Sequence, residues 1–312
     1  MRLISKPQID EIIRTLDGYE AITQGFIAYS NGDCVVPPVG ELLLDAGEVH
    51  IKYGYIRDQQ YYVVKIASGF YNNPALGLPS SNGLMQVFRQ DTGELSAIIL
   101  DEGALTDHRT AIAGAVCAAH FARKDITHAA IVGTGTQAKL QALHLNRYLG
   151  IKHFRIWGRR EEQARALKTA LSEMGVEASV NACLEDLCRD SKLIVTTTPA
   201  REPLINAKWI QDGTHINAVG SDTPDKQELE TALLGKASLV IADSVSQCKL
   251  RGEIAHALQA GDINQDDVVE LGTLLTSSYP RGDSDITVCD LTGVAVQDLK
   301  IAELVLEAAR NN

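Results

Sequence analysis

The sequence predicts an α/β protein with a doubly wound parallel sheet and a second, α+β domain. Short apolar runs alternate with helical segments from residue 129 to 243, which is typical of parallel strands covered by helices. Before about residue 115, the strand-like segments instead come in pairs joined by short turns. At 312 residues with 45% hydrophobic content, the chain is long enough for two cores.

The first domain is expected to cover 1–115 together with 290–312, and the second 116–289. The first should contain two helices in 7–29, a hairpin of 49–56 and 61–67, strands 83–88 and 95–100, and a helix at 110–122 leading to the second domain. A C-terminal helix at 298–309 should cross back to the first domain. The second should contain strands 129–132, 154–158, 193–198, 215–220 and 239–243, and a helix at 137–149.

The segment 129–138 has the pattern of a dinucleotide-binding turn of the Rossmann type. Gly133 permits a tight strand-to-helix turn, Gly135 lets a pyrophosphate approach bare backbone, and Ala138 is small enough for close helix packing. The phosphates would lie at a helix N-terminus. We expect cofactor contacts from Gly133, Thr134, Gly135, Thr136, Gln137 and Ala138, and from Thr197, Thr198, Val219 and Gly220 at the ends of two later strands.

The end of the second strand bears on the choice between NAD and NADP. An NAD site usually has a carboxylate there, whereas this chain has Arg159 and Arg160, whose guanidinium groups suit a 2′-phosphate. Glu161 and Glu162 follow and offer an alternative partner for both arginines. The sequence therefore favours NADP(H) within a general prediction of NAD(P)(H).

A pair of lysines marks the hairpin of the first domain. If 57–60 form its turn, Lys52 lies directly opposite Lys65, and like charges in this position are destabilising unless an anion lies between them. Lys65 stands in a strongly apolar strand, where an unpaired lysine is costly. On an exposed face, both would be ordinary solubilising residues.

Two further residues are candidates for chemistry. Arg109, at the predicted start of the helix at 110–122, presents a guanidinium that suits a carboxylate, or else a surface salt bridge. Asp222 follows the strand at 215–220, where ligands bind in open α/β sheets, so it is expected to face the nicotinamide; the alternative is an N-cap of the next helix.

Composition narrows the classes of partner. A net charge of −11 argues against nucleic acid or an anionic membrane as the main partner. The six cysteines lack metal-binding spacing and are expected to be reduced core thiols, with no metal site. With no secretory segment and no apolar run long enough to span a bilayer, a cytoplasmic location is expected.

The chain resembles the ornithine cyclodeaminase/μ-crystallin family over essentially its whole length. The resemblance rests on five segments and on their order along the chain: the Lys65 strand, 107–110, the glycine turn, 220–224 and 290–298. The resemblance implies a homodimer, with a substrate-binding and dimerisation domain beside a Rossmann domain. It also implies that Lys65 and Arg109 hold a substrate carboxylate and that Asp222 faces the reacting nitrogen.

Two departures argue against the cyclodeaminase itself. An arginine that such enzymes carry after a proline is replaced here by Val39, and a glutamate thirteen positions before the clamp lysine is replaced by Lys52. Lys52 would repel the distal ammonium of ornithine, or it stands in for the missing arginine.

The sequence thus predicts an NAD(P)-dependent oxidoreductase that moves hydride between nicotinamide and the α-carbon of an imino or amino acid. An imine (ketimine) reductase or amino-acid dehydrogenase is favoured, with Lys65 and Asp222 as catalytic residues and Lys65, Arg109 and Lys52 as substrate-binding residues. The alternatives are an ornithine cyclodeaminase, which forms proline and ammonia, and a non-catalytic NADP-dependent binding protein.

Overall fold

The computed structural model describes every residue except 278 and 312 and divides into two compact units. The first unit is Met1–Arg109 with Val294–Asn312, and the second is Thr110–Gly293. These boundaries lie within six residues of the expected ones, at 109/110 rather than 115/116 and at 293/294 rather than 289/290. Among the described helices, none is both long and apolar enough to cross a membrane.

The first unit is an antiparallel sheet with helices on one face, apart from β1, which pairs with β7 in parallel. Its strands are β1 (Arg2–Ile4), β2 (Cys34–Val35), β3 (Gly40–Leu44), β4 (Gly47–Ile56), β5 (Tyr61–Gly69), β6 (Ser81–Arg89) and β7 (Leu95–Ile99). Its helices are α1 (Lys6–Thr15), α2 (Tyr19–Ser30), the 3-10 helix η1 (Asn73–Leu76), the first turns of α3 (Ala104–Phe121), and α11 (Ala295–Asn311).

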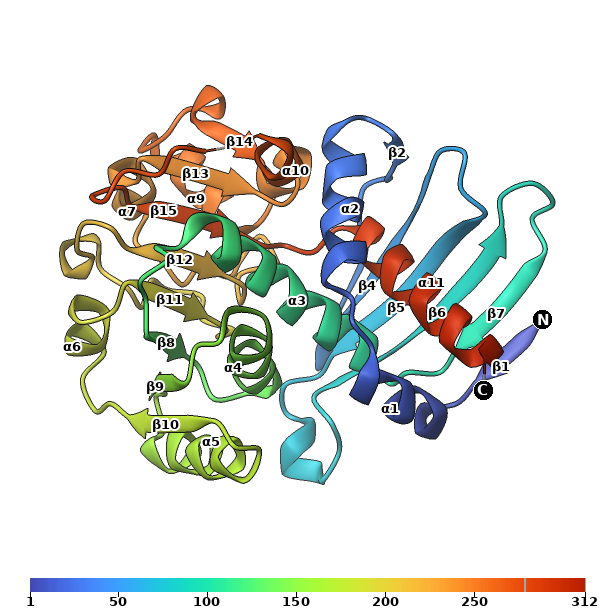
Figure 1. Cartoon of the computed structure of the whole chain (residues 1–312), viewed down its shortest axis with the longest axis horizontal. Helices are drawn as coiled ribbons and strands as arrows, with labels where there is room; N and C mark the ends of the chain where they lie inside the picture. The colour runs from blue at the N-terminus through green and yellow to red at the C-terminus, as the bar shows by residue number, and fades with distance from the viewer. Residues whose placement is uncertain (278, 312) are drawn as a thin grey trace. The chain divides into compact units, whose positions relative to one another are not determined.

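The C-terminal helix α11 lies across this sheet and packs on β4, β5 and β6 and on α2 (Figure 1). The strands alternate, so that Val63, Met85 and Val87 are fully buried on one face. The expected pair of N-terminal helices, the hairpin and the second strand pair are all confirmed. The Cα register sets Lys52 opposite Lys65, as the sequence predicts.

Two helices begin earlier than expected, and at each start a side chain accepts a hydrogen bond from a main-chain N–H group. Helix α3 starts at Ala104, where Leu105 N donates to Asp101 Oδ2 at 2.9 Å, so Arg109 lies inside the helix rather than at its start. Helix α11 starts at Ala295, where Val294 N donates to Gln297 Oε1 at 2.8 Å.

The second unit is an entirely parallel sheet (Figure 1) with the order β10-β9-β8-β11-β12-β15-β13-β14. Its strands are β8 (His128–Val132), β9 (His153–Trp157), β10 (Glu177–Val180), β11 (Leu193–Thr196), β12 (His215–Ala218), β13 (Leu239–Ala242), β14 (Val268–Glu270) and β15 (Thr287–Asp290). Its helical segments are α4 (Thr136–Leu149), α5 (Glu161–Glu173), α6 (Leu184–Arg189), η2 (Ala207–Trp209), α7 (Thr231–Lys236), α8 (Val245–Cys248), α9 (Gly252–Ala260), η3 (Gln265–Asp267) and α10 (Leu271–Thr276), after the remainder of α3.

The first five strands of this order follow the doubly wound pattern, with the chain reversing direction across the sheet between β8 and β11. This confirms the predicted fold class. The short strands β10, β14 and β15 were not predicted, and β15 lies between β12 and β13 rather than at an edge. The run 287–290 begins with a threonine and ends with an aspartate, so it lacks the continuous apolar pattern that predicts a buried strand.

The cysteines are all free thiols, but they are not all in the core. Cys117, Cys188, Cys248 and Cys289 are buried, whereas Cys183 is exposed and Cys34 is half-buried. Cys183 precedes α6 as its N-cap residue, a surface position, so the expectation of a core thiol is wrong there.

Candidate active site

The turn after β8 has the geometry of a dinucleotide-binding turn. Gly133 has φ 132°, and a Cβ there would lie 2.2 Å from Thr197 Oγ1. A Cβ on Gly135 would meet nothing within 4 Å, so its backbone is open to an approaching group. Ala138 is fully buried under the first turn of α4. The positive φ at Gly133, the open space at Gly135 and the buried Ala138 are compatible with the predicted dinucleotide turn, so these residues fit a dinucleotide.

The remaining predicted cofactor residues lie at the same edge of the sheet. Thr197 N donates to Val132 O at 2.9 Å and Val219 N donates to Thr196 O at 3.0 Å, which ties the ends of β8, β11 and β12 together. A Cβ on Gly220 would lie 2.2 Å from Thr198 O, so these segments approach closely. We refer to Gly133–Ala138, Thr197, Thr198, Val219 and Gly220 as the cofactor edge.

Arg159 and Arg160 follow β9 and are both exposed. A Cβ on Gly158 would lie 2.4 Å from Thr134 Cγ2, which brings the end of β9 next to the glycine turn. Glu161, one of the alternative partners, accepts a hydrogen bond from Arg165 Nε at 3.0 Å. The two arginines therefore remain candidates for a cofactor phosphate at this end of the sheet.

In the first unit, Lys52, Lys65 and Arg109 are all buried, at 7%, 2% and 3% exposure, so they are not surface solubilising residues. An anion does lie beside them, namely Asp298 of α11. Its Oδ1 accepts from Lys65 Nζ at 3.2 Å and from Arg109 Nε at 2.9 Å. Arg109 also donates to Gln297 Oε1 at 3.1 Å. We call Lys52, Lys65, Arg109 and Asp298 the clamp cluster.

The clamp cluster holds buried charges of both signs that shift one another's pKa. Burial alone would raise the pKa of Asp298, but Arg109, Lys65 and Lys52 outweigh it and lower that pKa. Burial, together with Arg109, lowers the pKa of Lys65 to about 8 even though Asp298 opposes the change. Asp298 is thus an ionised carboxylate that Arg109, Lys65 and Lys52 stabilise, and Asp101 is a second buried carboxylate that acts on Lys65.

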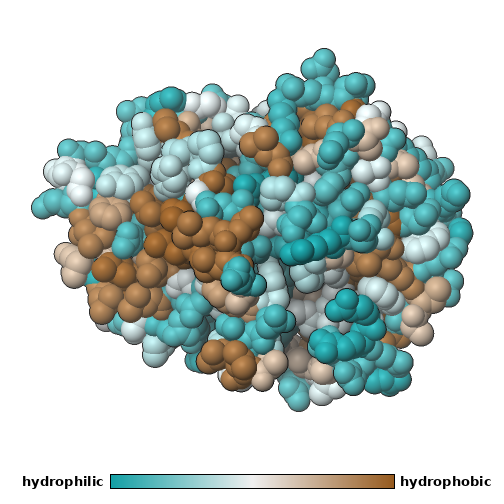
Figure 2. Space-filling model, turned by 180° about the vertical axis from the view of Figure 1, so that it is seen from behind, coloured by the Kyte–Doolittle hydropathy of each residue, from teal (hydrophilic) through white to brown (hydrophobic). Residues whose placement is uncertain are grey.

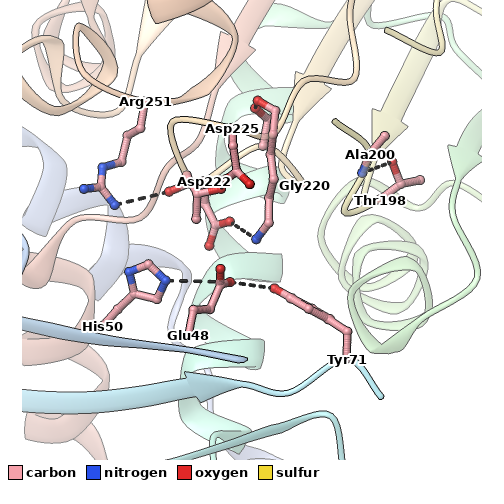
Figure 3. A network of polar contacts seen from close by, with 12 residues as sticks. Glu48, His50, Tyr71, Thr198, Ala200, Gly220, Asp222, Asp225 and Arg251 are labelled. Atoms are coloured by element: carbon pink, nitrogen blue, oxygen red, sulfur yellow. Dashed lines mark hydrogen bonds and ion pairs between the residues drawn. The ribbon is translucent and has the colours of Figure 1, made fainter. Parts of the chain in front are cut away.

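Asp222 lies in the loop between β12 and α7 and is not a helix N-cap, because the N-cap residue of α7 is Glu230. Lys226 Nζ donates to Asp222 Oδ1 at 2.7 Å, and Arg251 NH1 donates to the Asp222 carbonyl oxygen at 3.4 Å (Figure 3). Lys226 is 4% exposed. Sequence reasoning missed Lys226, although its spacing of four residues from Asp222 was a signal.

Three more polar residues of the first unit were missed. Glu48 and His50 share the helix-covered face of β4 with Lys52, because they are spaced by two residues along the strand. The Tyr71 hydroxyl donates to Glu48 at 2.8 Å, and His50 Nε2 lies 3.7 Å from the same carboxylate (Figure 3). Over the residues described, no group of His, Cys, Asp or Glu has the arrangement to hold a metal ion.

A doubly wound sheet with a glycine turn at its switch point and an open helix N-terminus is typical of a dinucleotide-binding domain. The ornithine cyclodeaminase/mu-crystallin family matches residues 2–312, and the chain belongs to this family. This confirms the resemblance, and the protein is an NAD(P)-dependent oxidoreductase of that family.

Three similar proteins cover nearly the whole chain. A protein of Sinorhizobium fredii named as an uncharacterized cyclodeaminase is 38% identical, over 99% of this chain and 96% of its own. An archaeal alanine dehydrogenase dimer with bound NAD has a TM-score of 0.90 at 30% identity, covering 99% of this chain and 97% of its own. The Δ1-pyrroline-2-carboxylate reductase of Thermococcus litoralis, with NADH and L-proline, has a TM-score of 0.93 at 25% identity, covering 100% and 98%.

The two glycines of the turn should respond differently to alanine. Gly133→Ala is expected to destabilise the protein by about 1–3 kcal/mol, because of its positive φ and the close contact with Thr197. Gly135→Ala, the matched control, has space for a methyl group and should fold normally but bind NAD(P)H more weakly. Urea unfolding and cofactor titration measure both effects. Equal stability of the two variants would contradict this assignment.

Proposed function

We propose that the protein is an imine reductase that converts an α-imino acid to the amino acid, with the reverse amino-acid dehydrogenation as the same chemistry. The observation that carries the proposal is the clamp cluster, in which the cations Lys52, Lys65 and Arg109 are buried together around Asp298. Hydride transfer requires that the substrate carbon be held at a fixed distance and angle to the nicotinamide. A substrate carboxylate bound by several cations fixes both. The archaeal and Thermococcus relatives, named for alanine and pyrroline-2-carboxylate, support the substrate class.

Each residue has a distinct role in this proposal. Lys65 and Arg109 bind the substrate carboxylate. Lys52 replaces the cation that is missing because Val39 stands where the cyclodeaminases carry an arginine. The residues of the cofactor edge would hold the dinucleotide, which would supply or accept the hydride of the reaction at the carbon that bears the nitrogen. Asp222, paired with Lys226, stabilises the positive charge on an iminium nitrogen or accepts a proton from an amine.

The cofactor and location belong to the same proposal. NADP(H) is favoured because two exposed guanidinium groups follow β9 where a carboxylate would select NAD. The solved relatives contain NAD or NADH, so both cofactors are tested below. A cytoplasmic location is supported by the six free thiols.

Oxidation of NADPH and of NADH, followed by absorbance, tests the function with cyclic ketimines and with 2-oxo acids plus ammonia or methylamine. Lys65→Ala and Asp222→Ala should each reduce kcat/KM by about 10²–10⁴-fold. Lys168→Ala, an exposed lysine of α5, is the control and should retain full activity. The ratio of NADPH to NADH turnover measures the cofactor preference.

Two results would overturn the imine reductase. Formation of proline and ammonia from ornithine, with no imine reduction, would establish the cyclodeaminase. Tight NADPH binding without turnover of any member of the panel would instead indicate a binding protein.

The pH dependence should report the charge of Lys65. Its pKa of about 8 leaves the side chain cationic below that pH and neutral above it, so carboxylate binding is lost as pH rises. We expect kcat/KM to fall above pH 8 by about tenfold per pH unit. Lys65→Arg keeps its charge and should lack this decrease. The same decrease in Lys65→Arg would exclude Lys65 as its origin.

We also propose a homodimer formed through the uncovered face of the first-unit sheet. Outward residues of β4 and β5 are apolar, with Tyr53 38% and Ile66 36% exposed, and Tyr62 stacks on Phe88 with ring centroids 4.9 Å apart. Figure 2 shows apolar side chains gathered over this sheet. A large apolar surface of this kind marks an interface, and the archaeal relative is described as a dimer.

A charge at the centre of that face should separate the subunits. Ile66→Glu is expected to give a folded monomer, measured by light scattering after size-exclusion chromatography, because a glutamate buried in an apolar interface has no partner. Leu250→Glu is the control, since Leu250 is an exposed apolar residue of the second unit. A stable dimer of Ile66→Glu would refute this interface.

A further inference from the structure

Glu228 is a fully buried carboxylate in the loop that follows β12, and it accepts four hydrogen bonds. Its Oε1 accepts from Thr198 N at 2.6 Å and from Thr198 Oγ1 at 2.7 Å. Its Oε2 accepts from Thr196 Oγ1 at 2.7 Å and from Gly220 N at 2.9 Å. One side chain therefore joins the backbone after β11 to the backbone after β12.

An ionised carboxylate is the group that satisfies all four donors. Two of them are main-chain N–H groups, which can only donate, and a carboxylate is an acceptor on both oxygens. A glutamine in the same place would direct its own NH₂ group at one of these N–H groups. Burial raises the pKa of Glu228 to about 7, and the hydrogen bonds from Thr196, Thr198 and Gly220 oppose that rise.

Glu228 is itself held in place by a second buried carboxylate. Glu253, in the first turn of α9, accepts from Glu228 N at 2.8 Å and from Leu229 N at 3.1 Å. Asp290, at the end of β15, accepts from Ile254 N at 2.8 Å and so fixes the start of α9. Three buried acids thus connect the end of β15, through α9, to the ends of β11 and β12.

The segments that Glu228 joins belong to the cofactor edge. A doubly wound sheet binds the two halves of a dinucleotide on its two halves, so the half with β8, β9 and β10 takes the adenosine end. The half that contains β11 and β12 takes the nicotinamide end. Gly220 leaves no free space, since a Cβ there would lie 2.6 Å from Glu228 Oε2. A shift of about 1 Å in this backbone would displace a reacting group enough to slow the reaction.

We propose that Glu228 is a positioning residue for the nicotinamide end of the cofactor, acting through the backbone of Thr198 and Gly220. The inference rests on the use of NAD(P) by this family and not on the identity of the substrate. The proposal predicts different effects at the two ends of the cofactor. Glu228 contacts Thr198 and Gly220, on the nicotinamide side of the cofactor edge, whereas the glycine turn serves the adenosine side.

The test compares Glu228→Gln with Glu230→Gln. Glu230 also accepts a main-chain N–H, from Ala207 at 2.7 Å, but it holds η2 rather than the cofactor edge. Dissociation constants are measured for NADH or NADPH and for ADP-ribose or its 2′-phosphate, which lack nicotinamide. For Glu228→Gln, we expect dinucleotide binding to weaken about tenfold and kcat to fall, with little change for ADP-ribose. Glu230→Gln should change neither the ratio of the two dissociation constants, for dinucleotide and for ADP-ribose, nor kcat.

If Glu228→Gln does not fold, Thr196→Val removes one of the four donors without a change of size and should shift the same ratio in the same direction. Equal weakening of dinucleotide and ADP-ribose, or a lower melting temperature with unchanged ratio and kcat, would overturn the proposal and leave Glu228 a stabilising residue only. Failure of the wild-type protein to reduce any imine, with dinucleotide binding intact, would refute the proposed substrate class but not this inference.

Discussion

The buried carboxylate of Asp298 holds together the functional part of the first unit. It pairs with Lys65 of β5 and Arg109 of α3, and so joins the C-terminal helix to segments 233 and 189 residues away in the sequence. A buried charge is costly unless it is paired, and removing one partner leaves the others without compensation. Lys65, Arg109 and Asp298 therefore depend on one another for their burial as charged groups.

The second unit uses buried acids in a different way. Glu228, Glu253 and Asp290 accept from main-chain N–H groups rather than from cations. Loops that follow parallel strands have N–H groups without strand partners, and a buried N–H needs an acceptor. A carboxylate provides more acceptor positions than a neutral side chain, so one acid can hold two loops. The price is a raised pKa, which reaches about 8 for Glu253 because of its burial and the neighbouring Glu228.

The hairpin shows how far sequence reasoning reaches. The turn at 57–60 determines the register, and the register places Lys52 opposite Lys65. Because both lysines are also buried, an anion is needed beside them. The anion in the structure is Asp298, and no local pattern pointed to it because its partners are distant in sequence. The protein thus supplies an anion of its own beside these lysines, and the binding of a substrate carboxylate there stays a prediction.

The sequence by itself determined the family, the glycine turn, the hairpin register and most helices and strands. The family follows from the order of short motifs along the chain, and the other features depend on neighbouring residues, through periodicity, turn geometry and the small size of Gly133, Gly135 and Ala138. The tertiary structure alone decided the position of β15 between β12 and β13, the pairing of Asp298, and the four hydrogen bonds of Glu228. These features join segments that are far apart along the chain, and only the folded backbone brings such segments within hydrogen-bonding distance.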